Sequence, residues 1–224
     1  MAIIARPESG IKAMAENAVS GQQDVAFRIL ADALKGQTSR SAQKPPFPGG
    51  PATSEWRVMW EGGGARGRLV ARIMELDGQR TDSTWLSIED AALGEGAWLR
   101  VATKAMEEMC LGARVAHRRG SFGSVELDGA LVQGLPPGEA EILALYGPLS
   151  EERDVAGPIR ATDALVGRMR GAFAEVLPRL QSIGDFTIEV EDGTMNVRYA
   201  AVFPRPEVYR SIVECARKLI DAAR

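Results

Sequence analysis

Apolar residues near the N-terminus recur at the spacing of an α-helix. One stripe consists of Val25, Ala26, Ile29, Leu30, Ala33 and Leu34. A run over residues 11–19 has the same spacing, and Gly21 is expected to break or kink the helix between the two runs. Gly36 is expected to end the pattern, because glycine is common just after the end of a helix. We therefore predict an amphipathic helical arm over residues 1–35.

The next stretch, residues 36–55, has no periodic pattern. It contains four of the 12 prolines of the chain, and Phe47 is its only large apolar residue. About twenty residues without periodicity are unusual for a loop inside a compact domain. This composition predicts a Pro/Gly-rich linker between the arm and a globular domain over residues 56–224. The prolines around Phe47 favour an extended conformation, which is typical of a spacer and also of a docking peptide.

Alternating apolar and polar positions after residue 55 indicate strands. Residues 56–61 and 68–76 flank a glycine-rich segment over residues 62–67, which is typical of a hairpin with its tip. Further short strands are expected at residues 84–88, 113–117, 124–127 and 142–146. Between them a helix is expected from the spacing of Trp98, Val101, Ala102, Ala105, Met106 and Met109.

The last third of the chain has the clearest pattern. A helical stripe runs from Leu165 to Leu180, and Thr162 stands where an N-terminal cap is expected. Strands over residues 186–190 and 195–199 alternate around Asp192-Gly193, a strong hairpin signal. A final amphipathic helix follows over residues 208–220. Hairpins with interspersed and C-terminal packing helices, preceded by a helical arm, predict an α+β fold.

Composition adds limited information about location. The chain of 224 residues is 45% hydrophobic and 25% charged, which is ordinary for a globular protein. It has neither the pattern of a signal peptide nor the roughly 20-residue apolar run of a membrane span. Cys110 and Cys215 both fall in apolar helical patterns, so we expect free thiols in a reducing, cytoplasmic compartment. Arginine greatly outnumbers lysine, which suggests a GC-rich bacterial source.

Candidate chemistry is sparse. His117 is the only histidine, and no cysteine cluster accompanies it, so the usual histidine or cysteine metal site is not predicted. The glycines of residues 62–67 lead into a predicted strand and lack the Lys-Ser or Lys-Thr pair of a phosphate loop. We therefore predict no catalytic residue, no metal and no cofactor. The formal net charge of −3 gives no reason to expect nucleic acid as a partner.

One basic cluster is a candidate site for an anion. It would consist of Arg66, Arg68, Arg114, His117, Arg118 and Arg119, if the two segments adjoin in space. Converging guanidinium groups bind phosphate or carboxylate through paired hydrogen bonds. The alternative is that these arginines are solvated side chains at strand ends.

Three functions remain open from the sequence. The first is a non-enzymatic adaptor that docks onto other proteins through residues that include Val25, Ile29, Leu30, Leu34, Phe47, Trp56 and Trp60. For Trp56 and Trp60, which share a strand face with Val58, core packing is the alternative. The second is a binding domain or enzyme for an anionic small molecule, using the arginines around His117. The third is a subunit of a homo-oligomeric assembly with exchange of the arm.

Overall fold

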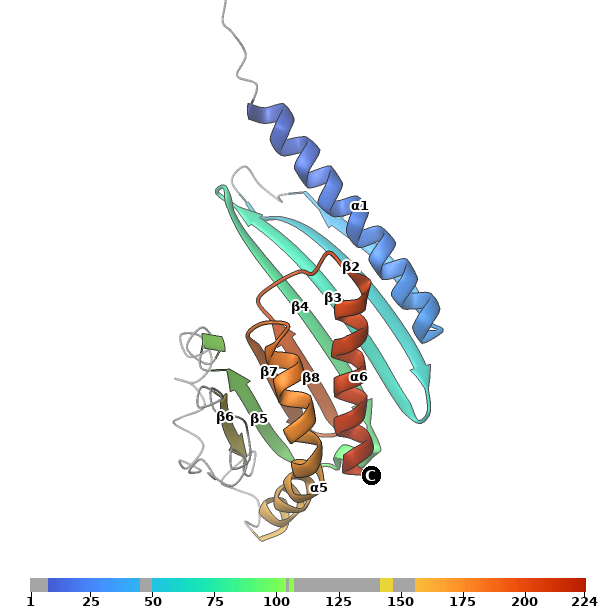
Figure 1. Cartoon of the computed structure of the whole chain (residues 1–224), viewed down its shortest axis with the longest axis vertical. Helices are drawn as coiled ribbons and strands as arrows, with labels where there is room; N and C mark the ends of the chain where they lie inside the picture. The colour runs from blue at the N-terminus through green and yellow to red at the C-terminus, as the bar shows by residue number, and fades with distance from the viewer. Residues whose placement is uncertain (1–7, 45–49, 104, 107–141, 147–155) are drawn as a thin grey trace, which may run out of the picture.

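The main feature of the fold is one antiparallel sheet with helices on a single face (Figure 1). The computed structural model describes residues 8–44, 50–103, 105–106, 142–146 and 156–224; in 8–19, 142–146 and 156–161 only the backbone is described. In chain order the elements are α1 (Glu8–Leu34), β1 (Gln37–Gln43), β2 (Ala52–Gly62), β3 (Ala65–Leu76), β4 (Gln79–Asp90), the 3₁₀ turn η1 (Ala91–Leu93), β5 (Trp98–Thr103), β6 (Ile142–Tyr146), α5 (Ala156–Gln181), β7 (Phe186–Glu191), β8 (Thr194–Tyr199) and α6 (Pro206–Ala223).

The sheet has eight strands in the order β1-β2-β3-β4-β8-β7-β5-β6, and all adjacent pairs are antiparallel. Helices α5 and α6 lie side by side over its middle, and α1 lies over the β1–β2 side next to α6 (Figure 1). The other face of the sheet carries none of the described helices. The predicted α+β class is therefore confirmed, including the N-terminal and C-terminal helices.

Three tight turns connect the strands of the hairpins. Gly63-Gly64, Asp77-Gly78 and Asp192-Gly193 each have two successive residues with positive φ. This conformation twists with the flanking strands and suits glycine and aspartate in two-residue hairpins. The hairpin predicted around Asp192-Gly193 is confirmed. The glycine-rich tip is shorter than expected, because residues 65–67 already belong to β3.

The core lies between the sheet and the helices. Trp56, Val58 and Trp60 on β2 point into it, as the period-two pattern predicts, and α6 contributes a continuous buried stripe. Gly67 has a specific role here: a Cβ at this position would lie 2.0 Å from the indole ring of Trp60. The ring therefore packs directly on the backbone of β3, and only glycine leaves room for it.

A buried polar network joins α1 to the C-terminal part of the core. The Gln23 amide donates to the carbonyl oxygen of Phe203 (2.7 Å) and accepts from the hydroxyl of Tyr209 (2.9 Å). The same hydroxyl accepts from the backbone N–H of Phe203 (3.0 Å). Each of these buried polar groups is thus satisfied, which a buried amide requires. Burial raises the pKa of Tyr209, so the phenol stays protonated.

The structure corrects the expected arm. α1 is one continuous helix through Gly21, whose added Cβ would meet nothing within 4 Å. Its described part is in the core rather than detached, since Ala26, Phe27, Leu30 and Ala31 are buried. The apolar stripe read from the sequence is wider than the buried face, so Val25 and Ile29 remain exposed.

The expectation that residues 36–55 lack secondary structure is wrong for most of the stretch. Residues 37–43 form β1 and residues 52–55 begin β2, and the two strands pair from Gln37 opposite Met59 to Gln43 opposite Thr53. β1 has no apolar alternation because both of its faces are exposed. Gly36 is required by a close approach: an added Cβ would lie 2.4 Å from the carbonyl oxygen of Met59.

Two further expectations are corrected in the second half of the chain. Residues 98–103 form β5 instead of a helix, and all six are buried, so no alternation marks the strand. Thr162 lies inside α5 and does not cap it; its hydroxyl accepts from the N–H of Trp98 at 3.4 Å. The expected strand at 142–146 is confirmed as β6. Those at 113–117 and 124–127 fall outside the described residues.

Candidate functional site

The first candidate surface is the edge strand β1. It is the last strand at one end of the sheet, and all seven of its residues are exposed. Its sequence contains no proline and one charge, Arg40. Edge strands are usually protected by charges, proline, bulges or a covering segment, because their unpaired backbone groups accept another strand. β1 has few of these protections.

The register shows which backbone groups face outward from β1. The turn Gly63-Gly64 makes Gly62 and Ala65 a hydrogen-bonded pair, and such pairs alternate along antiparallel strands. Residues 59, 57, 55 and 53 of β2 therefore bond to residues 37, 39, 41 and 43 of β1. The N–H and C=O groups of Thr38, Arg40 and Ala42 consequently point to the open edge.

Arg40, the one charged residue of β1, is bound by Asp24 of α1. The Arg40 guanidinium donates to one carboxylate oxygen of Asp24 (2.9 Å), and the Trp56 indole N–H donates to the other (2.8 Å). The same guanidinium lies 5.5 Å from the centroid of the Trp56 ring. These contacts fasten α1 to both strands and direct the Arg40 guanidinium toward α1.

The second candidate surface is the face of the sheet opposite the helices, where Glu55 is clamped by two arginines. Arg57 donates to one of its oxygens (2.5 Å) and Arg72 donates to the other (2.7 Å). Burial of the Glu55 carboxylate alone raises its pKa, but the hydrogen bonds from Arg72 and Arg57 outweigh burial and the pKa falls below its ordinary value. The cluster fixes three charged side chains across β2 and β3.

This lowered pKa predicts a specific dependence of stability on pH. Glu55 contributes stability above the unfolded pKa, which lies near 4.5, and this contribution is lost as the pH falls through the lower folded pKa. Glu55→Gln should cost about 2 kcal/mol of unfolding free energy at neutral pH and much less near pH 3. Urea unfolding at both pH values measures the difference. The exposed Glu61→Gln serves as control, and an equal loss at both pH values for Glu55→Gln would contradict the assignment.

Farther along the same face, Trp85 lies between arginines of the two neighbouring strands. The Arg68 guanidinium of β3 is 5.0 Å from the ring centroid, and that of Arg198 on β8 is 5.1 Å from it. The indole N–H donates to the side chain of Asn196 (2.9 Å). Stacking holds each guanidinium in place while leaving donors at its edge. Arg68 forms no ion pair with any other residue that the structure describes.

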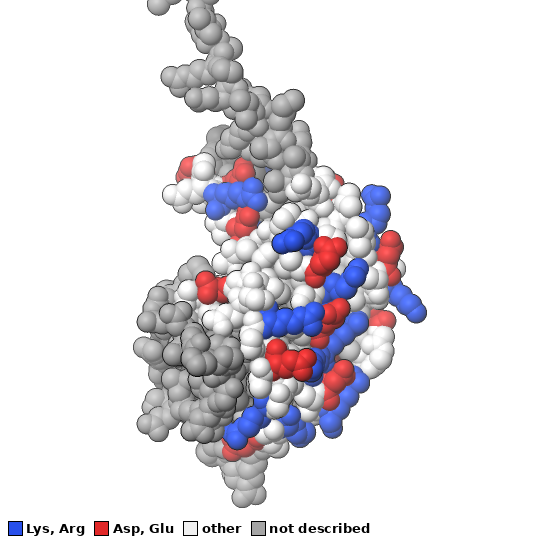
Figure 2. Space-filling model, viewed as in Figure 1, with Lys and Arg blue, Asp and Glu red and all other residues white. Residues whose placement is uncertain are grey.

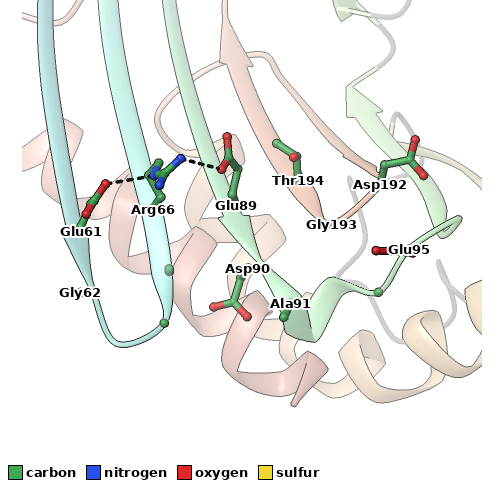
Figure 3. Close-up of a pocket in the computed structure, with 13 residues that line it drawn as sticks. Glu61, Gly62, Arg66, Glu89, Asp90, Ala91, Glu95, Asp192, Gly193 and Thr194 are labelled. Carbon is green, nitrogen blue, oxygen red and sulfur yellow. Dashed lines mark hydrogen bonds and ion pairs between the residues drawn. The ribbon is translucent and has the colours of Figure 1, made fainter.

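Arg66 separates two hollows at the end of the β2–β3 hairpin. Its guanidinium lies 3.0 Å from Glu61 and 3.7 Å from Glu89, on the strands to either side (Figure 3). One hollow, of about 750 Å³, is lined by further carboxylates, Asp90, Glu95 and Asp192. Asp90 is already bound by Arg224 at 2.8 Å, and Asp192 accepts from the N–H of Gly96. This hollow is acidic but shows no group that requires a ligand.

The other hollow, which we call the notch, lies where β1 begins. It has a volume of about 610 Å³ and its lining includes Lys35, Gln37, Met59, Arg68 and Ser87. Four of these form a straight row across four strands, since Gln37 is opposite Met59, Met59 opposite Arg68, and Arg68 opposite Ser87. The notch thus runs from the open edge across the sheet to Arg68.

The structure brings together only part of the predicted anion site. Arg66 and Arg68 lie two residues apart on β3, but Arg66 is committed to Glu61 and Glu89. The other four predicted members, Arg114, His117, Arg118 and Arg119, lie outside the described residues. The positions of Trp85 and Arg198 beside Arg68 were not predictable from the sequence, because only the sheet order brings β3, β4 and β8 together.

The predicted partner-binding residues divide into four groups. Leu30, Trp56 and Trp60 are buried in the core, so they offer no accessible surface. Val25 and Ile29 are 55% and 40% exposed on the outer face of α1, and Leu34 is half-buried against the core. Phe47 lies outside the described residues. Among the described members of this set, Val25 and Ile29 on the outer face of α1 are the ones accessible enough for docking.

Among the described residues, charges of both signs are mixed on the helix-bearing side. Figure 2 shows Lys and Arg side chains interspersed with Asp and Glu on this side, and ion pairs such as Arg179–Glu214 (2.7 Å) link α5 to α6. Within the described ranges, no group of three or more His, Cys, Asp or Glu side chains is placed to hold a metal ion. Among the same residues, no helix is long and apolar enough to cross a membrane. Cys215 is buried, and burial raises the pKa of its thiol.

The chain was compared with protein-family models, curated proteins and solved structures. The sequence matches no family model, and neither a curated protein nor a solved structure is detectably similar to the chain. The candidate surfaces are therefore the β1 edge, the Glu55 and Trp85 clusters, and the notch.

Proposed function

We propose that the protein is a non-enzymatic interaction module that binds an extended segment of another protein along β1. The observation that carries the proposal is the outward backbone of Thr38, Arg40 and Ala42 on a strand whose seven residues are all exposed. Each of the three residues offers one donor and one acceptor. An added strand uses such groups for affinity, and side chains of alternate residues for specificity.

The surroundings of β1 support this role. Asp24 and Trp56 hold the strand and α1 as one unit, so the edge is preorganised before binding. Val25 and Ile29 on the outer face of α1 add exposed apolar surface near the same end of the sheet. α1 thus acts as a fixed support for docking, in place of the detached arm that the sequence suggested.

A partner of different sequence fits the edge better than a second copy of the chain. Symmetric antiparallel pairing of β1 with β1 about its central residue would place Arg40 opposite Arg40. Like charges directly opposite each other destabilise a strand pair. Pairing in other registers would leave fewer residues matched. Sedimentation of the full chain tests this point, and a concentration-dependent dimer abolished by Ala42→Pro would favour the second copy.

The proposal is tested with a displayed library of unstructured random peptides, selected against the full chain. Ala42→Pro removes an outward N–H without removing a hydrogen bond to β2, so the variant should fold and bind selected peptides at least about tenfold more weakly. Ala42→Ser keeps the N–H and should bind as the natural chain does. Equal binding by Ala42→Pro, or no selected peptide at all, would contradict strand addition.

A further inference from the structure

The notch beside β1 points to the chemistry of the segment that the edge receives. We infer that the partner segment leaves the edge at Gln37 and crosses Met59, and that an acidic residue on this part of it pairs with Arg68. This inference rests on the proposed strand addition and specifies its ligand. Its basis is the row Gln37, Met59, Arg68 and Ser87, which lines one hollow from β1 to β4 on the face opposite the helices.

The charge at the end of the row favours a carboxylate. Arg68 is half-buried, stacked on Trp85 at 5.0 Å, and has no carboxylate partner in the described parts of the chain. A partly desolvated guanidinium in this position binds an anion with little loss of side-chain freedom. Lys35 and Ser87 line the same hollow and bring a second cation and a hydroxyl to its lining.

The two carboxylates of the notch do not compete for Arg68. Glu61 and Glu89 both face Arg66, at 3.0 and 3.7 Å, and so share its charge. Met59 stands between the edge and Arg68 and is 46% exposed. The row therefore offers an apolar contact first and a cation second, which matches an apolar residue followed by Asp or Glu.

The direction of the segment follows from the sheet. Every pair in the sheet is antiparallel, and antiparallel pairing is the more stable arrangement. A strand antiparallel to β1 passes Gln43 first and Gln37 last. The acidic residue consequently lies on the C-terminal side of the strand that pairs with β1, and a parallel strand would place it on the N-terminal side.

The test measures the peptides selected against the full chain, each made with Glu and with Gln at the acidic position. The natural chain should prefer Glu by about tenfold, and Arg68→Gln should abolish the preference. Arg198→Gln is the control, since Arg198 stacks on the same indole at 5.1 Å without lining the notch, although it also lies 3.7 Å from the buried Glu189 carboxylate. This control should keep the preference for Glu. Urea unfolding of each variant confirms that it is folded.

Different results identify which claim fails. Peptides that require the open edge but show no preference for Glu, or a preference unaffected by Arg68→Gln, overturn the acidic notch and leave strand addition standing. Undiminished peptide affinity in Ala42→Pro, together with a preference for Glu that disappears in Arg68→Gln, contradicts strand addition, and with it the inference that one segment occupies both places. Absence of any binding peptide overturns both.

Discussion

Replacing Phe27 with alanine is expected to lower the free energy of unfolding by about 4 kcal/mol. The Phe27 ring is 1% exposed and packs edge-on against Tyr209 with the centroids 5.1 Å apart. Its removal leaves a cavity between α1 and α6, beside the polar network of Gln23. Such a loss is a large part of the total stability of a domain.

Urea unfolding of the full chain measures this effect. Val25→Ala on the same helix is the control, because Val25 is 55% exposed and should change the free energy of unfolding little. Equal stability of Phe27→Ala and the natural chain would mean that α1 is an independent arm. For the same reason, removing residues 1–55 should unfold the protein, since β1 and part of the core would be lost with them.

Gly67→Ala is expected to cost about 3 kcal/mol. The new Cβ would lie 2.0 Å from one atom of the Trp60 ring and 2.1 Å from another, so the buried indole must move. Movement is resisted on the helix side, where the Arg217 guanidinium lies 5.8 Å from the ring centroid. Over-packing at this point would displace β3 or expose the indole.

The matched control for Gly67 is Gly62, five positions earlier in the same hairpin. An added Cβ at Gly62 meets nothing within 4 Å, so Gly62→Ala should leave stability nearly unchanged. The midpoint of thermal unfolding and the wavelength of the tryptophan fluorescence maximum are compared between the two variants. A Gly67→Ala protein with an unchanged midpoint would show that Trp60 does not depend on the glycine.

Local signals in the sequence predicted much of the sheet correctly. Asp192-Gly193 specifies a two-residue turn, and the alternation of Trp56, Val58 and Trp60 places them on one face, as the structure shows. The last helix was also predictable, because its apolar residues form one narrow stripe after Pro206. In these elements the apolar residues repeat with the period of the local backbone conformation, because one face of each element is buried.

β5 and β1 were not predicted, because neither strand has one buried face and one exposed face. β5 is buried on both faces and therefore resembles a helix segment in its apolar content, whereas β1 is exposed on both faces and resembles a loop. β1, at the start of the expected linker, was recognisable only from its pairing with β2. The notch could not be predicted for the same reason. Gln37, Met59, Arg68 and Ser87 become neighbours only through the registers of three successive strand pairs.

The most direct test of strand addition is amide hydrogen exchange of the full chain, free and with a selected peptide bound. In the free protein the amides of Thr38, Arg40 and Ala42 should exchange fast, and those of Ser39 and Ser41, bonded to β2, should exchange slowly. Bound peptide should slow the first three by at least about tenfold and leave the other two nearly unchanged. If the peptide binds while Thr38, Arg40 and Ala42 keep exchanging at their free rates, the segment does not add to β1 and the account is wrong.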